Sequence, residues 1–176
     1  MALWKRGEVM ADFAELASKA KLGQADAFAQ LYELVYQDLY RFALYTLKNG
    51  HDAEDVVSDT IMDAYLEISS LRDASAFKAW IFRILANKCK KRLKQYLQKT
   101  TELPEDFADH ERDVCEDMDV RRAFAALNDE ERLILALNLF GGYSSREIGT
   151  TLLLSPNTVR SKQSRALKKM EIILTR

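Results

Sequence analysis

Two helix-start signals lie close together near the end of the chain, and they constrain its fold more than any other feature. Ser144 and Glu147 have the S-x-x-E spacing of a capping box, in which each side chain satisfies a free backbone N–H at a helix start. Ser155 followed by Pro156 marks a second start, because proline at the first helical position loses no hydrogen bond. Only a tight turn fits between helices that begin so close together, so the sequence predicts a C-terminal helix-turn-helix.

The second of these helices has an apolar and a polar face. Val159, Ala166, Met170 and Ile173 follow heptad-like spacing and are expected to pack on the domain. The polar face is expected to point outward and to bind DNA, because Asn and Arg can pair with base edges while Ser, Thr and Lys suit phosphate oxygens. A solvated surface without a partner is the alternative. Together with the capping serine, the predicted DNA-binding residues are Ser155, Asn157, Thr158, Arg160, Ser161, Lys162, Ser164 and Arg165.

The remainder of the chain also has helical patterning. It contains only two prolines, and no alternation of apolar and polar residues lasts long enough to indicate a strand. The sequence therefore predicts an all-α fold. Asn49-Gly50 is expected to close the first long helix, Asp52 to cap the next, and Asn128-Asp129 to cap a later one. The predicted helices before the helix-turn-helix cover residues 25–48, 51–68, 76–99, 120–127 and 130–140.

Charge is strongly segregated along the chain, although the formal net charge is only −1. Residues 101–135 carry 4 basic and 12 acidic groups, whereas residues 136–176 carry 7 basic and 2 acidic groups. The acidic stretch also contains Pro104 and few large apolar residues, so it is interpreted as a linker over residues 100–118. The sequence predicts two small helical domains, over residues 23–99 and 119–176, after an N-terminal extension (1–22) that is helical in part. Local basic segments of this kind are typical of a protein that binds polyanions.

Two helices of the first domain carry rows of charge. Asp52, Asp55, Asp59 and Asp63 are spaced three, four and four residues apart, which places four carboxylates along one helix. Such a row suits a basic partner, but it is more often a solvated face. The helix over 76–99 becomes heavily basic after its apolar start. Trp80 lies in its apolar stripe, which favours a place in the core over a base-stacking role.

Other classes of protein fit poorly. His51-Asp52 resembles the dipeptide of metal phosphohydrolases, but such a site needs further ligands, and only one other histidine, His110, occurs. Cys89 and Cys115 lie far apart outside any CxxC pattern, as in a reducing cytoplasm. The basic start without an apolar segment after it predicts no secretory signal, and no apolar run is long enough for a membrane helix. We therefore expect a cytoplasmic protein that is not an enzyme and that has no cofactor, metal site or membrane insertion.

Four segments, in order, resemble the extracytoplasmic-function group of bacterial sigma factors. The resemblance implies an N-terminal domain that binds RNA polymerase core and opens the promoter −10 element, and a C-terminal domain that reads the −35 element. It also implies an acidic linker through the RNA exit region and an anti-sigma factor that holds the protein inactive. The segments are AFAQLYELVYQDLYRFALYTLKN, DAEDVVSDTIMDAYLEI, SAFKAWIFRILANKCKKRL and LNDEERLILALNLFGGYSSREIGTTLLLSPNTVRSKQSRALKKM.

The resemblance assigns roles by position. The core-polymerase contacts would be Asp52, Asp55, Ser58, Asp59 and Asp63, and the −10 contacts would be Arg72, Asp73, Ser75, Asn87, Lys88, Lys91 and Arg92.

The chain departs from the family pattern in two places. DAEDxxQE is DAEDVVSD here, with Ser58 and Asp59, and the helix-turn-helix has Gly149 for the usual alanine and Leu153 where glycine is frequent. The main alternative is a helix-turn-helix regulator that binds operator DNA without polymerase, and a pure interaction protein is the third possibility.

Overall fold

The regular structure of the chain is helical wherever it is described. A computed structural model describes residues 6–98 and 118–175, with side chains from residue 13, and within these ranges every regular element is a helix. The predicted all-α fold is therefore confirmed, whereas the predicted linker lies outside the described residues except at Met118. The elements are α1 Arg6–Lys21, α2 Ala25–Leu47, α3 Gly50–Glu67, the short 3-10 turns η1 Ile68–Ser70 and η2 Ala74–Ala76, α4 Phe77–Gln98, α5 Met118–Ala125, α6 Asp129–Leu139, α7 Ser145–Leu152 and α8 Pro156–Leu174.

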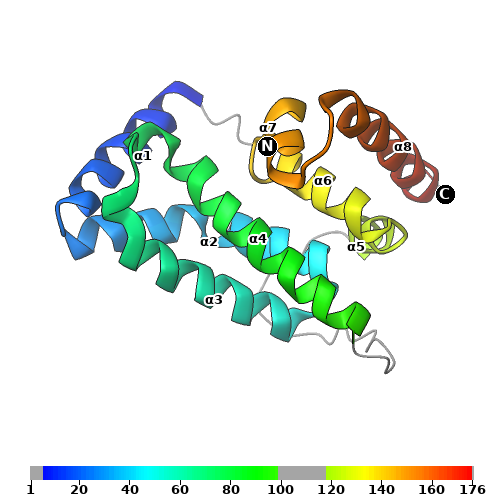
Figure 1. Cartoon of the computed structure of the whole chain (residues 1–176), viewed down its shortest axis with the longest axis horizontal. Helices are drawn as coiled ribbons and strands as arrows, with labels where there is room; N and C mark the ends of the chain where they lie inside the picture. The colour runs from blue at the N-terminus through cyan, green and yellow to red at the C-terminus, as the bar shows by residue number, and fades with distance from the viewer. Residues whose placement is uncertain (1–5, 99–117, 176) are drawn as a thin grey trace.

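The first four helices form one packed group. Helix α2 contacts α1, α3 and α4, and α3 also lies along α4 (Figure 1). The predicted apolar stripe of α2 is buried, with Leu31, Val35, Leu39 and Phe42 fully inaccessible. These side chains meet the buried face of α4, where Phe82 packs edge-on against Phe42. Within the described parts of the chain, no helix is long and apolar enough to cross a membrane.

The turn between α2 and α3 differs from the prediction. Lys48, not a glycine, takes the left-handed conformation with φ 58° that ends α2, and its N–H donates to the Leu44 carbonyl. Asn49 caps α3 by accepting a hydrogen bond from the Asp52 N–H at 2.9 Å, and Gly50 lies inside the helix. The predicted cap at Asp52 is therefore wrong, because the asparagine amide already satisfies this helix start. The Asp52 carboxylate is left available for a partner outside its own helix.

The C-terminal helices confirm the predicted caps. Asn128 and Glu131 form a complete capping box at the start of α6, and Ser144 and Glu147 form another at the start of α7. Ser155 caps α8 by accepting from the Thr158 N–H at 3.0 Å. Helices α7 and α8 contact each other across the short turn between them, so this unit is a helix-turn-helix.

The two departures within the helix-turn-helix compensate each other. Leu153 adopts φ 60° and ends α7, although left-handed backbone is unfavourable for a residue with a Cβ. This turn brings the Leu154 N–H to within 2.8 Å of the Gly149 carbonyl. A Cβ at Gly149 would lie only 2.6 Å from the Leu154 carbonyl oxygen. Glycine is therefore needed one turn earlier in the chain than the family pattern places it.

Gly149→Ala is expected to lower the free energy of unfolding by about 2 kcal/mol, because the added methyl group meets a backbone oxygen that cannot move alone. Urea denaturation followed by circular dichroism measures the change. The neighbouring Thr150→Ala is the matched control, since this exposed side chain is expected to contribute little. Equal stability of Gly149→Ala and wild-type protein would show that the close approach between α7 and the turn is not maintained in solution.

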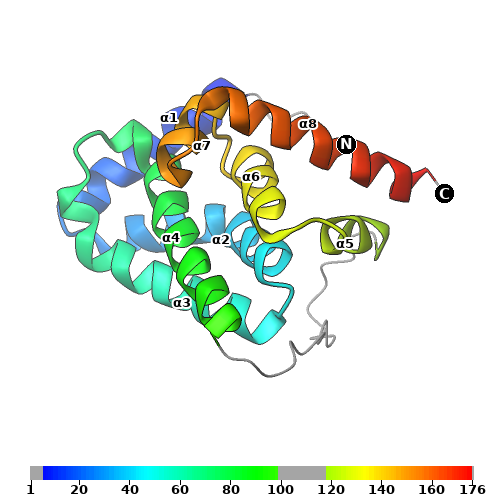
Figure 2. The same cartoon turned by 45° about the vertical axis from the view of Figure 1, so that its right-hand side comes forward.

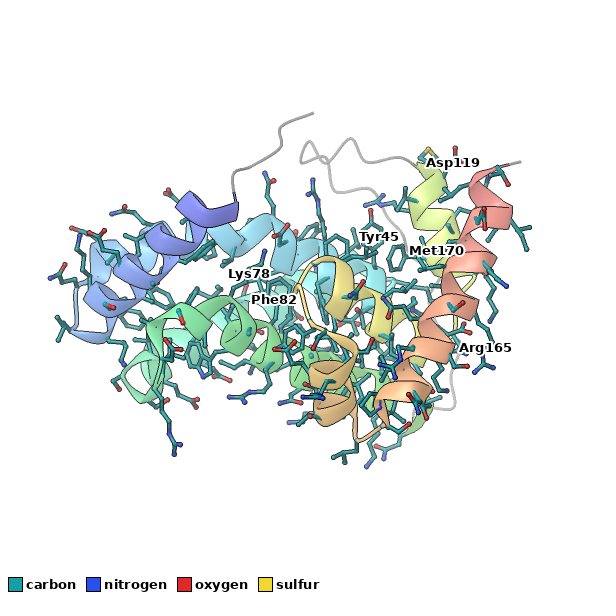
Figure 3. The ribbon with its side chains drawn as sticks, turned by 90° about the horizontal axis from the view of Figure 1, so that it is seen from above. Tyr45, Lys78, Phe82, Asp119, Arg165 and Met170 are labelled. Carbon is teal, nitrogen blue, oxygen red and sulfur yellow. The ribbon has the colours of Figure 1, made fainter. Side chains whose placement is uncertain are left out.

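The two groups of helices pack directly against each other. Helix α6 contacts both α2 and α4, and Figures 1 and 2 show α5–α8 lying against this side of the first group. Tyr45 of α2 is 3% exposed and stacks between Phe124 at 4.7 Å and Phe140 at 5.7 Å between ring centroids. In Figure 3, Tyr45 lies beside Met170 of α8, which belongs to the same buried cluster.

Buried polar side chains also cross this boundary. Arg132 of α6 is 2% exposed and donates from Nε to the Thr46 carbonyl at 3.2 Å, and its other nitrogens reach the Leu127 carbonyl and Asp129. The Tyr143 hydroxyl donates to the Ala79 carbonyl of α4. Burial raises the pKa of Tyr143 to about 12, so this donor stays protonated well above neutral pH. The two predicted domains are therefore in direct contact through a buried interface.

Candidate nucleic-acid interface

The outward face of α8 carries the polar residues expected to read DNA. Asn157, Arg160, Ser161, Ser164 and Arg165 are all exposed. The Arg160 guanidinium donates to the Asn157 side chain, and Arg165 donates from Nε to the Ser161 carbonyl at 3.3 Å. Figure 3 shows Arg165 on the outer side of the helix. These bonds within the helix order two exposed guanidinium groups, with Arg165 on the flank nearer Glu131 of α6, and such groups suit base or phosphate recognition.

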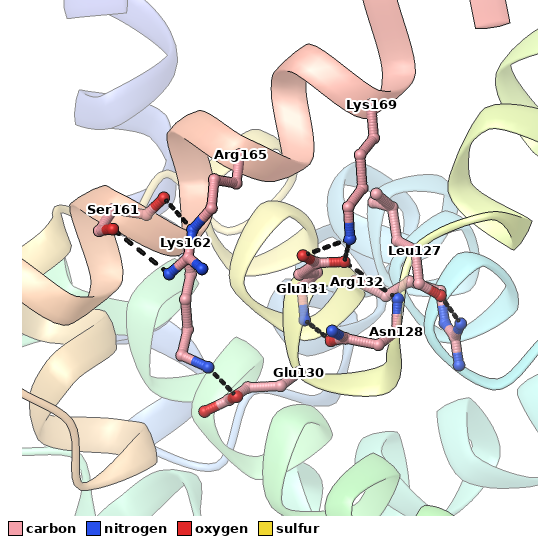
Figure 4. Close-up of polar contacts among 9 residues, drawn as sticks. All are labelled: Leu127, Asn128, Glu130, Glu131, Arg132, Ser161, Lys162, Arg165 and Lys169. Atoms are coloured by element: carbon pink, nitrogen blue, oxygen red, sulfur yellow. Dashed lines mark hydrogen bonds and ion pairs between the residues drawn. The ribbon is translucent and has the colours of Figure 1, made fainter.

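Three of the predicted α8 contacts have structural partners. Ser155 and Thr158 make the helix cap described above. Lys162 is half-buried and pairs with Glu130 of α6, with 2.5 Å between Nζ and Oε2, so its expected outward position is corrected. Lys169 pairs in the same way with Glu131, at 2.8 Å (Figure 4). The inner side of α8 therefore uses Lys162 and Lys169 to bind α6, and the exposed cations of the outer face are Arg160, Arg165 and Lys168.

Helix α4 presents two separate polar rows. The first contains Lys88 and Arg92 and faces α3. Lys88 pairs with Asp63 at 2.7 Å, and Arg92 pairs with Asp52 at 2.8 Å and lies 3.9 Å from Asp55. Residues predicted to bind DNA phosphates therefore meet residues predicted to bind polymerase.

Asp52 is held from two sides. The Tyr96 hydroxyl, one turn beyond Arg92, also donates to its carboxylate, and burial with this bond raises the pKa of Tyr96. These pairs join α3 to α4, and the polymerase and DNA roles of Asp52, Asp63, Lys88 and Arg92 stay predictions. Asp55, Ser58 and Asp59 remain exposed on α3.

The second row of α4 faces the helix-turn-helix side. Arg83, Asn87 and Lys91 follow one another at intervals of four residues and are exposed. Sequence reasoning missed Arg83, although its spacing from Asn87 is the signal that identifies it. Trp80 is partly buried against Phe77, as expected for core, but it also borders the surface between the helix groups.

A cavity of about 840 Å³ gathers several predicted −10 residues. One wall comes from the loop after η1 and from α4, and the opposite wall comes from Tyr143 and α7. The space therefore lies between the helix-turn-helix and the first helix group. Ser75 does not line it, and neither do Lys88, Lys91 or Arg92. Its lining includes Arg72, Asp73, Trp80, Arg83 and Asn87 on one side, and Tyr143, Glu147, Thr150 and Thr151 on the other.

The loop that forms this wall is ordered by its own side chains. The Asp73 carboxylate accepts from the Ser75 N–H at 2.9 Å and from the Ser75 hydroxyl at 2.7 Å. These bonds lower the pKa of Asp73, so the carboxylate stays charged into more acidic solution than an ordinary aspartate. Arg72 and Asp73 are exposed, while Leu71 is buried beneath them. A carboxylate, a guanidinium and the Asn87 amide therefore border one space, as donors and acceptors for a base edge would.

Among the described residues, the remaining reactive groups do not form a second site. Cys89 is fully buried, and burial raises the pKa of its thiol, so this thiol is poorly suited to nucleophilic chemistry. Across the described ranges 13–98 and 118–175, no three His, Cys, Asp or Glu side chains are grouped so as to hold a metal ion.

Two family models match the chain in the order that the sequence analysis predicts. Sigma-70 region 2 matches residues 31–98, and Sigma-70, region 4 matches residues 117–170. The first contains α3 and α4 with the −10 candidates, and the second contains the helix-turn-helix. A regulator that shares only the helix-turn-helix would not produce the first match.

Individual relatives agree over nearly the whole chain. The ECF RNA polymerase sigma factor SigM of Mycobacterium tuberculosis is 30% identical over 164 residues, which span 92% of this chain and 84% of that protein. RNA polymerase sigma factor SigV of Bacillus subtilis is 29% identical over 143 residues, covering 80% of this chain and 86% of that protein.

The fold is similar to that of a solved sigma factor. RpoE from Bartonella quintana, solved in complex with the anti-sigma factor NepR, superposes with a TM-score of 0.69 at 27% identity. The match covers 84% of this chain and 96% of the RpoE chain. Together with the matches to regions 2 and 4, these similarities show that the chain belongs to the ECF group of the sigma-70 family of RNA polymerase sigma factors.

Proposed function

We propose that this chain binds RNA polymerase core and directs initiation at promoters through two DNA-binding surfaces, one in each predicted domain (23–99 and 119–176). The observation that carries the proposal is the presence, on one chain, of an exposed guanidinium-bearing face on α8 and a second polar row on α4 beside the cavity. A sigma factor needs both, because it contacts two promoter elements and the polymerase together.

The α8 face is the proposed −35 reader. Arg160 and Arg165 would reach base edges in the major groove, and Asn157, Ser161 and Ser164 would contact adjacent bases or phosphates. Ser155 and Thr158 would act at the helix start, where free backbone N–H groups favour phosphate. Lys162 contributes through its pair with Glu130, which fixes how α8 is seated on α6.

The α4 row and the loop are the proposed −10 reader. Arg72, Asp73 and Asn87 would receive an unstacked base, with Ser75 holding Asp73 in place. Arg83 and Lys91 would follow the strand backbone. Lys88 and Arg92 are proposed to support the helix through their pairs with α3, so that their positive charge reaches the DNA only at longer range.

The exposed part of the acidic row is the proposed polymerase contact. Asp55→Ala combined with Asp59→Ala is expected to weaken assembly with bacterial core polymerase by about tenfold, because two exposed carboxylates are removed without breaking a strong internal pair. Fluorescence anisotropy of the labelled full chain, titrated with core polymerase, measures the change. Thermal unfolding is expected to stay close to that of the wild type.

Asp52→Ala is the comparison variant, because Asp52 belongs to the same acidic row but is paired with Arg92 and Tyr96 inside the protein. It leaves Arg92 and Tyr96 without their shared acceptor, so it is expected to lower the stability by about 1–2 kcal/mol. If the double variant at Asp55 and Asp59 assembled normally, the exposed carboxylates would be ordinary solvated surface.

This role implies a mode of action, a cellular location and a regulator. It acts by binding, without a reaction of its own, in the cytoplasm where promoter DNA and polymerase meet. An anti-sigma factor is the proposed regulator. Support comes from RpoE, a relative of similar fold that was solved bound to the anti-sigma factor NepR.

A further inference from the structure

The first helix lies outside both family matches, yet it is packed behind the candidate −10 residues. Helix α1 contacts η1, η2 and α4 as well as α2. Ala17 and Ala20 are buried on its inner face, which allows the helix to approach closely. Figure 1 shows α1 at the end of the molecule where α3 passes into α4. Residues 71–76, called the −10 loop below, therefore rest on α1.

The end of α1 is fixed by its own turn. Gly23 has φ +85°, a conformation that favours glycine, and its N–H donates to the Ala20 carbonyl at 2.9 Å. The Gln24 N–H donates back to the Lys19 carbonyl at 3.3 Å. Such a paired C-terminal turn holds the last residues of the helix in one arrangement. The backbone of Lys21, the final residue of α1, is therefore held in one position next to the −10 loop.

Lys21 reaches the −10 loop directly. Its Nζ donates to the Arg72 carbonyl at 3.5 Å, a contact between residues that lie 51 positions apart in the chain. The neighbouring Asp73 has a pKa lowered chiefly by its bonds from Ser75, and the positive charge of Lys21 adds to this effect. One cation thus faces both backbone and carboxylate of the loop that carries the candidate base contacts.

An aromatic contact links α1 to the same region from behind. Phe13 stacks on Phe77 with 6.4 Å between ring centroids, and Phe77 contacts Trp80 at 6.0 Å. Trp80 in turn lines the cavity with Arg72 and Asn87. Both the loop and the cavity wall are therefore supported by α1.

From this arrangement we infer that α1 is a positioning helix for the −10 loop. Lys21 links the end of α1 to this loop. Base preference at the −10 element would therefore depend on a residue that lies outside both matched regions. The inference rests on the proposed function. Lys21 acts through Arg72 and Asp73 and does not itself need to touch a base.

The test compares Lys21→Met with Lys21→Arg, which keeps the charge and a donor, and with Lys19→Met. Lys19 is the matched control because it pairs with Glu15 within α1 and faces solvent. The first measurement uses the protein alone. Exchange of the Ser75 and Ala76 amide protons, which are bonded to Asp73, is followed by NMR. Lys21→Met is expected to accelerate this exchange by about fivefold with an unchanged unfolding midpoint, and the other two variants are expected to match the wild type.

The second measurement uses core polymerase and a promoter on which the wild-type protein starts transcription, with each base of the −10 element varied in turn. Lys21→Met is expected to reduce the preference for the best base by about fivefold, while binding to the −35 duplex is unchanged. Unchanged amide exchange in Lys21→Met, or an equal loss in Lys19→Met, would overturn the inference. If the wild-type protein starts no transcription, the proposed function fails, whereas the amide exchange still decides the loop contact.

Discussion

Replacing Tyr45 by alanine is expected to lower the free energy of unfolding by about 3 kcal/mol and to loosen the packing of α5–α8 on the first helix group. The ring is almost fully buried and stacks on both Phe124 and Phe140, so its removal leaves a cavity at the centre of the interface. Urea denaturation measures the stability, and small-angle X-ray scattering measures the radius of gyration, which is expected to increase.

The same variant is expected to bind single-stranded −10 DNA more tightly, by about threefold. Thr150 and Thr151 of α7 form one wall of the cavity that Arg72 and Asn87 also line, so α7 restricts how an incoming strand reaches this space. Loosening the interface raises the population in which the space is open. Lower stability and higher affinity in one variant would be hard to explain by general unfolding.

Tyr36→Ala is the matched control for this experiment. Tyr36 is a partly buried tyrosine of the same helix, but its ring contacts are with Tyr32 and Tyr40 within α2. It is expected to leave the radius of gyration unchanged. If Tyr45→Ala had wild-type dimensions and wild-type −10 affinity, the two helix groups would not restrict each other in solution.

Arg160→Ala combined with Arg165→Ala is expected to weaken binding to a −35 duplex by about 100-fold at fixed salt concentration. Both guanidinium groups are exposed on the outer face of α8, and each is held by a bond within the helix. Loss of a bidentate base contact costs more than loss of a simple phosphate contact, so the effect is expected to depend on sequence. Fluorescence anisotropy with the preferred and a scrambled duplex separates the two contributions.

Lys169→Ala is the control for charge. It removes a cation from the same helix, but from the side that pairs with Glu131. Its effect on DNA affinity is expected to be about threefold or less, through the general electrostatic attraction alone. Similar losses for Lys169→Ala and for the combined arginine variant would mean that α8 binds DNA through its overall charge and does not read bases.

Local signals in the sequence predicted the helix-turn-helix well. Ser144 and Ser155 accept bonds from N–H groups three residues on, and such bonds form wherever the helix forms, while Pro156 begins its helix without losing a bond. The same applies to the capping box at Asn128. The turn at Lys48 was mispredicted because a lysine can take the left-handed conformation when the flanking helices require it.

Contacts between helices could not be predicted from such signals. The acidic row on α3 and the basic residues of α4 each suggested a partner outside the chain, but Asp52 and Arg92 bind each other. Helical spacing shows that Lys88 and Arg92 share a face, but not which neighbour that face meets. The same reason hid the contact between Tyr45 and α5–α8, and the position of α1 behind the −10 loop.

The most direct test of the central claim is transcription in vitro with bacterial core polymerase on a pool of promoter fragments, with and without this protein. We predict transcripts that start at defined sites only when the protein is present, and upstream sequences that share two elements at a constant spacing. DNA binding by the protein without core association or transcription would contradict the claim, and would identify a helix-turn-helix regulator that binds operator DNA.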